Sequence, residues 1–316
     1  MPSIQAHLLK LVFRLLRFTS SRNTPFDPAK LRAQHDLAPR LFKALVELET
    51  EPVDVDSIPG EWITPLKVAD GRTILYLHGG YFLAGSIVSH RNLAGNIAAA
   101  AQARALIIDY RLAPEHPFPA GLEDAYSAYC WLLAQGIRPG QILLAGDSAG
   151  GGLVLSLLLV LRQRGASLPA AAVCLSPVTD MTHGGASRRS NADKELMVDP
   201  RISAQVPALY LAGEDPQNPL VSPLFGDLHG LPPLLIQVGS DETLLSDATR
   251  FAERARQAGV DVTLEVWPGM QHVWQLMASL LPEGRQAIAR IGAFVTQHEI
   301  GGRGRLHPGA TMDASA

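Results

Sequence analysis

The pentapeptide Gly146-Asp147-Ser148-Ala149-Gly150 lies between two apolar runs, and this arrangement constrains the fold more than any other feature of the chain. A short apolar run before the serine and a longer one after it predict a strand, a sharp turn and a helix. Such a turn strains the serine backbone and lifts its hydroxyl above the sheet. Because the residues two before and two after the serine crowd each other, both must be glycine, as Gly146 and Gly150 are. The pattern predicts an α/β fold with a nucleophilic serine.

Strand-like apolar runs alternate with helical patterns along most of the chain. The expected strands are 73–77, 105–109, 141–145, 171–175, 234–238 and 262–267. The expected helices are 90–103, 122–134, 153–165, 247–258 and 283–298. This alternation predicts an α/β protein with a mostly parallel central sheet covered by helices on both faces. In such sheets, ligands bind beyond the carboxyl ends of the strands.

Two regions do not follow this alternation, residues 1–50 and residues 178–230. We expect residues 1–50 to form an N-terminal helical cap segment. We expect residues 51–300 to form the catalytic domain, with 178–230 as a second cap segment over its active edge. The tail, residues 301–316, has almost nothing to bury and is expected to be disordered.

Residues 7–18 are largely apolar but are interrupted by Lys10, Arg14 and Arg17, which recur on one side of a helix. This pattern is too interrupted for a signal peptide or a membrane span, so we expect no stable membrane insertion. It is typical of an amphipathic surface helix packed on the protein body. Transient contact with a membrane surface is the minor interpretation, because basic amphipathic helices can lie in that interface.

Composition excludes few functions, but it indicates the class of protein, its partners and its compartment. Hydrophobic residues make up 47% and charged residues 18% of the 316 residues, as in folded proteins with a large core. A net charge of −3 without a concentrated basic stripe argues against a nucleic-acid partner. Cys130 and Cys174 lie in apolar surroundings, so we expect free thiols and a cytoplasmic location.

Ser148 requires a base, and that base requires an orienting acid. In this fold the chain order is serine, acid, histidine. The strand expected at 234–238 leads into Asp241 and Glu242, and the strand at 262–267 leads to His272. Both loops belong to the edge that carries Ser148. The order predicts His272 as the base, with Asp241 and Glu242 both available as the acid.

The negative oxygen of a tetrahedral intermediate also requires hydrogen-bond donors. His78-Gly79-Gly80 follows the strand expected at 73–77, and glycines allow backbone N–H groups to approach a substrate closely. Together with the amide of Ala149, this loop is expected to form an oxyanion hole.

Four motifs give the chain a specific resemblance to the bacterial hormone-sensitive-lipase-like family of serine esterases. They are HGG at 78–80, DYRLAPE at 109–115, GDSAGG at 146–151 and GMQHVW at 269–274. The resemblance extends over about residues 60–300. It implies an α/β-hydrolase fold with a helical cap, no cofactor and no metal. It also implies hydrolysis of carboxylic esters of short-to-medium acyl chains.

The resemblance also implies roles for single residues. It gives Ser148 as nucleophile, His272 as base, and Gly79, Gly80 and Ala149 as oxyanion donors. It favours Glu242 over Asp241 as the acid, because relatives carry an Asp at the position of Glu242. The family usually has a third glycine where this chain has Tyr81, so the candidate substrate-binding residues are Tyr81, Phe82 and Trp274. Trp274 is compatible with either the core or the pocket wall.

Other functions remain open from the sequence. The same triad would open a lactone, and the same fold serves receptors that bind a small ligand without hydrolysing it. An intact His272 argues against a receptor. A phosphate-binding loop is excluded, because Ser148 and Gly152 occupy positions where the dinucleotide and P-loop motifs require other residues. The expected partner is a small-molecule ester, with a homodimer as one possible assembly.

Overall fold

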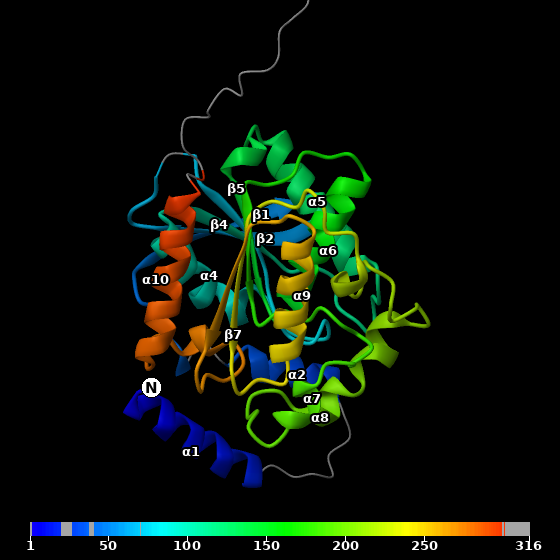
Figure 1. Cartoon of the computed structure of the whole chain (residues 1–316). Coiled ribbons are helices and arrows are strands. Elements are labelled where there is room, and N and C mark those ends of the chain that lie inside the picture. The colour runs from blue at the N-terminus through cyan, green and yellow to red at the C-terminus, as the bar shows by residue number, and fades with distance from the viewer. Residues whose placement is uncertain (1, 20–26, 38–40, 70, 299, 301–316) are drawn as a thin grey trace, which may run out of the picture.

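Figure 1 shows a computed structural model in which residues 2–19, 27–37, 41–69, 71–298 and 300 are described. One eight-stranded sheet of these residues has the order β1-β2-β4-β3-β5-β6-β7-β8. The strands are β1 (Leu48–Val55), β2 (Ile58–Pro65), β3 (Thr73–Leu77), β4 (Arg104–Ile108), β5 (Ile142–Asp147), β6 (Ala171–Leu175), β7 (Leu234–Gly239) and β8 (Val262–Trp267). β1 and β2 pair antiparallel, β2 pairs antiparallel with β4, and all other pairs are parallel.

The burial of the central strands explains why apolar runs in the sequence predicted them correctly. Every residue of β3, β5, β6 and β7 is buried. Strands covered on both faces consist of continuous apolar residues, and their ends are sharply marked. The six expected strands are therefore confirmed, whereas the β1–β2 hairpin was missed. β1 has an exposed face, and its sequence LETEPVDV alternates poorly.

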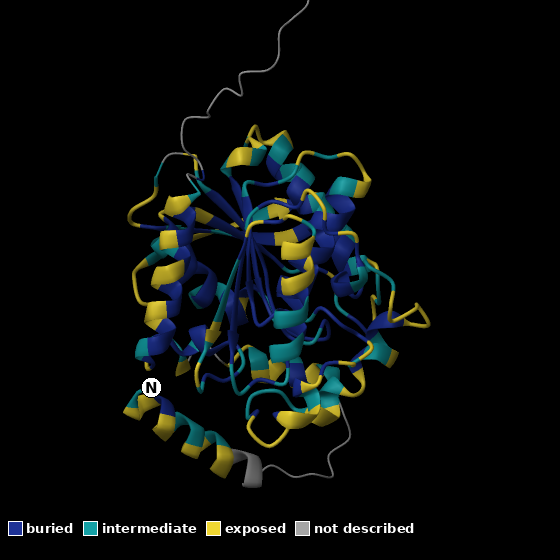
Figure 2. Ribbon diagram, in the orientation of Figure 1, coloured by how far each residue is buried: buried dark blue, intermediate teal, exposed yellow. Residues whose placement is uncertain are grey.

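Helices cover both faces of the sheet. Figure 1 shows α4 and α10 on one side and α5, α6 and α9 on the other. The flanking helices are α4 (Ile87–Ala101), α5 (Ala120–Ala134), α6 (Ala149–Gln163), α9 (Leu245–Gln257) and α10 (Pro282–Gln297). Two large apolar cores result, and Figure 2 shows the buried strands between them. The mostly parallel sheet covered by helices on both faces, expected from the sequence, is confirmed.

The remaining helices lie outside this alternation, and all of them except α1 are short. They are α1 (Ile4–Thr19), α2 (Pro28–His35), α7 (Ser187–Ser190), α8 (Pro200–Ser203), η1 (Pro139–Gln141), η2 (Pro207–Leu211), η3 (Pro223–Phe225) and η4 (Trp274–Met277). In Figure 1, α2, α7 and α8 gather at one end of the sheet, with α1 beyond them. Because β1 begins at Leu48, the first 50 residues are not wholly helical. The tail 301–316 lies outside the described residues.

α1 is a surface helix packed on the protein body, as expected. Ala6, Leu9 and Phe13 pack against a small apolar cluster around Trp274 and Met277. Among the helices of the described ranges, none has the length and apolar character needed to cross a bilayer.

The turn between β5 and α6 has the strained geometry expected from its glycines. Ser148 has φ 54° and ψ −118°, in the left-handed half of backbone space that a side chain rarely occupies. A Cβ on Gly146 would lie 2.6 Å from the Gly150 carbonyl oxygen, and a Cβ on Gly150 would collide with the carbonyl of Leu77. The turn is therefore closed by backbone packed directly on backbone.

Replacing Gly150 by alanine is expected to destabilise the protein by about 1–3 kcal/mol or more, because backbone atoms cannot move aside as a flexible side chain can. Thermal unfolding of Gly150→Ala, compared with Gly140→Ala, measures the effect. Gly140 is the matched control, since a Cβ there meets nothing within 4 Å. Equal melting temperatures for the two variants would contradict this account of the turn.

Candidate active site

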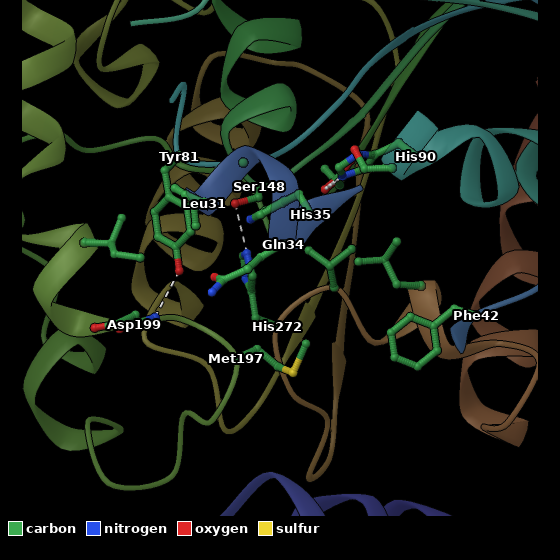
Figure 3. Close-up of a pocket in the computed structure, with 16 residues that line it drawn as sticks. Leu31, Gln34, His35, Phe42, Tyr81, His90, Ser148, Met197, Asp199 and His272 are labelled. Carbon is green, nitrogen blue, oxygen red and sulfur yellow. Dashed lines mark hydrogen bonds and ion pairs between the residues drawn. The ribbon is translucent and has the colours of Figure 1, made fainter. Parts of the chain in front are cut away.

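The structure brings together the three side chains that the sequence predicted. Ser148 follows β5, Glu242 follows β7 and His272 follows β8, so all three lie at the carboxyl edge of the sheet. The Ser148 Oγ is 2.9 Å from His272 Nε2, and His272 Nδ1 is 3.0 Å from Glu242 Oε2. Figure 3 shows Ser148 and His272 pointing toward each other. This is the geometry of a nucleophile, a base and an orienting acid.

The two candidate acids have different partners. Glu242 is fully buried, and its Oε1 accepts hydrogen bonds from Ser176 Oγ at 2.8 Å and from the Gly239 amide at 2.6 Å. Its other oxygen is thereby aimed at His272. Asp241 turns the opposite way and pairs with Lys10 of α1 at 2.6 Å. The arrangement supports Glu242 as the acid and gives Asp241 a role in attaching α1.

The surroundings of His272 favour its protonated form. Burial alone lowers the pKa of this imidazole, but the hydrogen bond and charge of Glu242, with further charges on Glu195 and Asp147, outweigh burial and raise the pKa above its ordinary value. A base with these neighbours holds a proton taken from serine more firmly than an isolated histidine does.

Glu195 is a site residue that the sequence reasoning missed. It lies before α8, is 1% exposed, and has a carboxylate oxygen within 4.8 Å of ligand atoms of both Glu242 and His272. Its oxygens accept hydrogen bonds from the amides of Met197 at 2.8 Å and Thr243 at 3.3 Å. Burial, opposed by His272 but reinforced by Glu242, raises the pKa of Glu195. Both ring nitrogens of His272 are already engaged, so the cluster suits a proton relay better than a metal site.

Nothing in the sequence around Glu195 distinguishes it from an ordinary surface carboxylate. It precedes Leu196, Met197 and Val198, and an acid beside a short apolar run is common. Its burial depends on residues 178–230 folding back over the sheet edge, which is a long-range event. Only the spatial arrangement reveals it.

The oxyanion loop corrects one sequence-based assignment. The amide of Gly79 donates to Asp147 Oδ1 at 3.1 Å and is therefore not available to a substrate. A Cβ on Gly79 would lie 2.9 Å from the Asp147 carbonyl oxygen, so this glycine allows two backbone segments to meet. Among the described residues, the amides of Gly80, Tyr81 and Ala149 have no acceptor. These three, and not Gly79, are the available donors.

Asp147 fixes this loop to the strand edge. Its carboxylate also accepts a hydrogen bond from Tyr76 Oη at 2.7 Å and lies 3.3 Å from His90 Nε2. Burial raises the pKa of Asp147, but His90 and Tyr76 more than offset this and lower it overall. His78 stacks on Tyr110 with ring centroids 4.3 Å apart. The aromatic and carboxylate contacts hold the loop in a form whose later amides are exposed to the cavity.

A cavity of about 340 Å³ opens over Ser148 and His272. Its wall is mostly apolar, and Figure 3 shows side chains from α2 and from the segment before α8. The lining residues include Leu31, Gln34, His35, Phe42, Gly80, Tyr81, Met197, Asp199, Ile202, Val273 and Leu276. Tyr81 links the oxyanion loop to the segment before α8, because its hydroxyl accepts a hydrogen bond from the Asp199 amide at 3.0 Å.

A second, smaller cavity of about 30 Å³ lies on another side of Ser148. Tyr81 borders both cavities, whereas Phe82 borders only the smaller one and stacks on Tyr210. Trp274 borders neither. It is fully buried against Trp267, and its indole N–H donates to the Glu283 carbonyl at 3.3 Å. The expectation of Trp274 as a substrate-binding residue is therefore not met, since its side chain, two residues beyond His272, lies in the core.

Glu242→Gln is expected to lower kcat by about 10³-fold or more, because the neutral amide no longer fixes the tautomer of His272. Asp241→Asn is the neighbouring control and is expected to stay within about threefold of the parent enzyme. Steady-state kinetics on p-nitrophenyl acetate separate the two. A collapse of kcat in Asp241→Asn alone would assign the acid to Asp241.

Glu195→Gln is expected to move the acidic limb of the kcat/KM profile to lower pH. His272 accepts the serine proton only when neutral, so activity falls as pH drops below its pKa. Removing the Glu195 charge destabilises the imidazolium and lowers that pKa. Glu253→Gln, which changes an exposed carboxylate of α9, is the control. If the Glu195→Gln variant is folded and the acidic limb of its kcat/KM profile stays at the pH of the parent enzyme, Glu195 does not act on His272.

Comparisons with known proteins agree with this geometry. A family model described as the alpha/beta hydrolase fold matches residues 74–276. The acetyl-hydrolase of Streptomyces hygroscopicus is 46% identical over 288 residues, covering 91% of this chain and 95% of that protein. The esterase of Acinetobacter venetianus is 37% identical, covering 86% and 90%. The crystal structure of an esterase from the bacterial hormone-sensitive lipase family superposes with a TM-score of 0.88 at 47% identity, covering 94% of this chain and 99% of that one. The chain is an ester hydrolase that belongs to the α/β hydrolases and, among them, to the bacterial hormone-sensitive lipase family of esterases.

Proposed function

We propose that this ester hydrolase cleaves esters of short acyl chains through an acyl-enzyme on Ser148. The observation that carries the proposal is the continuous hydrogen-bonded chain from Glu242 through His272 to the Ser148 hydroxyl at the floor of a cavity. The serine oxygen attacks the ester carbonyl carbon while its proton passes to His272 Nε2. Glu242 keeps the other ring nitrogen protonated and stabilises the imidazolium that forms.

The developing oxyanion is held by the amides of Gly80, Tyr81 and Ala149. The amide after the nucleophile and an amide from the preceding strand–helix loop are the usual pair in this fold. Each such donor contributes roughly 3–4 kcal/mol of transition-state stabilisation. When the intermediate collapses, the alcohol leaves with the proton from His272. Water then attacks the acyl-enzyme by the same route and releases the acid.

The two cavities beside Ser148 suggest different occupants. Only the larger one is bordered by His272, which must protonate the leaving alcohol. The smaller one, about 30 Å³, has room for an acetyl methyl or slightly more, since one water occupies roughly 10–15 Å³ on the same measure. We therefore assign the acyl group to the smaller cavity and the alcohol to the larger, with Tyr81 as the wall between them.

In this proposal two segments form a cap over the site: residues 1–47, which precede β1, and residues 178–230. Support comes from Leu31 and Met197, one from each segment, which line the larger cavity. Arg32 of α2 pairs with Glu115 at 2.6 Å and donates to the Leu83 carbonyl at 2.9 Å, which fastens this cap to the oxyanion loop.

The cellular setting and assembly also belong to the proposal. Cys130 and Cys174 are both unpaired, which supports a reducing, cytoplasmic location. A homodimer and the absence of a nucleic-acid partner stay predictions from the sequence.

Ser148→Ala is expected to abolish hydrolysis of p-nitrophenyl acetate while leaving the fold intact. Substantial turnover by this variant would contradict the mechanism. Tight ligand binding by the parent protein without any turnover would instead favour the receptor alternative. A lactone assayed alongside measures whether the same triad also opens cyclic esters.

Among p-nitrophenyl esters, kcat/KM is expected to fall from acetate to butyrate and by at least about tenfold from butyrate to octanoate, because the smaller cavity cannot hold the longer chain. Val178→Ala enlarges that cavity and is expected to raise kcat/KM for the butyrate ester relative to kcat/KM for the acetate ester. Met197→Ala, in the larger cavity, is the control and is expected to leave the acyl preference unchanged. Equal kcat/KM for acetate and octanoate would overturn the assignment of the cavities.

A further inference from the structure

α1 has a second apolar face that nothing in the described structure covers. Ile4, Leu8, Leu11, Val12 and Leu15 recur at the spacing of one helical stripe and are 48–78% exposed. The opposite side of α1 is the one that packs on the body, through Ala6, Leu9 and Phe13. Figure 2 shows α1 at the periphery of the molecule, with exposed residues along its outer side. Five large apolar side chains in one row are more than the scattered exposed leucines that a soluble surface ordinarily carries.

The charges of α1 are of one sign. Its sequence IQAHLLKLVFRLLRFT contains Lys10, Arg14 and Arg17 and no acidic residue. In helical projection Lys10 and Arg14 lie on one flank, between the exposed apolar row and the side that contacts the body. Lys10 is held by Asp241, while Arg14 is exposed. An apolar row with cations beside it complements a surface that offers acyl chains below and anionic headgroups above.

α1 is also connected to the catalytic cavity. Phe42 packs on the same small cluster as Leu9 and Phe13, and it lines the cavity that holds Ser148 and His272. Close to Phe42 in the chain, Leu41, Leu45 and Val46 are exposed by 68%, 40% and 42%. Phe42 therefore links α1 to the wall of the cavity, and further exposed apolar side chains lie next to Phe42 in the chain.

We propose that α1 docks the enzyme onto an anionic lipid surface. The exposed row enters the boundary between headgroups and acyl chains, with the axis of α1 parallel to the membrane, and Arg14 contacts lipid phosphates. At 16 residues α1 is about 24 Å long, enough for the row to lie flat on a bilayer. Docking in this orientation brings the catalytic cavity to the side of the molecule that faces the lipid.

Two other occupants are disfavoured by features of the chain. A second copy meeting α1 face to face would bring two sets of cations together, with no acid on the helix to offset them. The tail GGRGRLHPGATMDASA carries only Leu306 and Met312 as large apolar residues and is itself basic at its start. Neither supplies both the apolar surface and the negative charge that would match this face.

Co-sedimentation of the full chain with vesicles tests the proposal. The wild-type protein is expected to bind vesicles of phosphatidylglycerol and phosphatidylcholine at least tenfold more tightly than pure phosphatidylcholine vesicles, and more weakly in high salt. Leu8→Gln, Leu11→Gln and Leu15→Gln combined, and separately Arg14→Glu, are each expected to weaken binding at least tenfold. Leu66→Gln is the matched control, since Leu66 is 75% exposed and lies just past β2. Turnover of soluble p-nitrophenyl acetate and the melting temperature verify that each variant is folded.

The outcomes are distinct. Loss of vesicle binding in the α1 variants, with the control unchanged and soluble turnover retained, supports the proposal. Absence of binding by the wild-type protein, or equal binding by the triple variant, overturns it. A dimer that becomes monomeric in the triple variant, measured by light scattering without lipid, would assign the face to a second copy.

Discussion

Close contact between backbone segments at the Ser148 turn is the constraint on which the rest of the site depends. Gly146 and Gly150 allow β5 and α6 to meet β3 without intervening side chains, and Ser148 is then forced to a positive φ. Holding one residue there costs roughly 1–3 kcal/mol, which the buried parallel sheet around it must offset. The same turn places Asp147 against Gly79, so the nucleophile and the oxyanion loop are set by one structural unit.

Around this unit, catalytic groups from different parts of the chain meet at Ser148. Ser148 lies at the carboxyl end of β5, and Glu242 and His272 follow the ends of β7 and β8, which pair with each other further along the sheet. Glu195 reaches the same point from the segment that covers them. Buried carboxylates on one side of the imidazole favour the charge that forms when serine loses its proton. The open amides on the other side favour the charge that forms on the substrate. The site is therefore complementary to both charges of the transition state.

The sequence was sufficient for the parts of the structure that depend on local patterns. Continuous apolar runs marked the buried strands, and the glycines around Ser148 marked the turn, because each reflects sterics within a few residues. The β1–β2 hairpin has a weak pattern and was missed. The choice of Gly79 as a donor was wrong because it depends on a hydrogen bond to a residue 68 positions away. The burial of Glu195 and the direction of the Trp274 side chain depend on how distant segments pack. The side of α1 that contacts the body depends on a cluster assembled from both ends of the chain.

The central claim is that one hydroxyl carries the covalent step. Mass-spectrometric mapping after reaction with an organophosphate ester such as diethyl p-nitrophenyl phosphate measures this directly, since the phosphorylated serine does not turn over at an appreciable rate. The account predicts one diethylphosphoryl group per chain, on the peptide that contains Ser148, and loss of esterase activity in proportion to labelling. Full labelling of Ser148 with activity retained, or stoichiometric labelling at another residue, would contradict it.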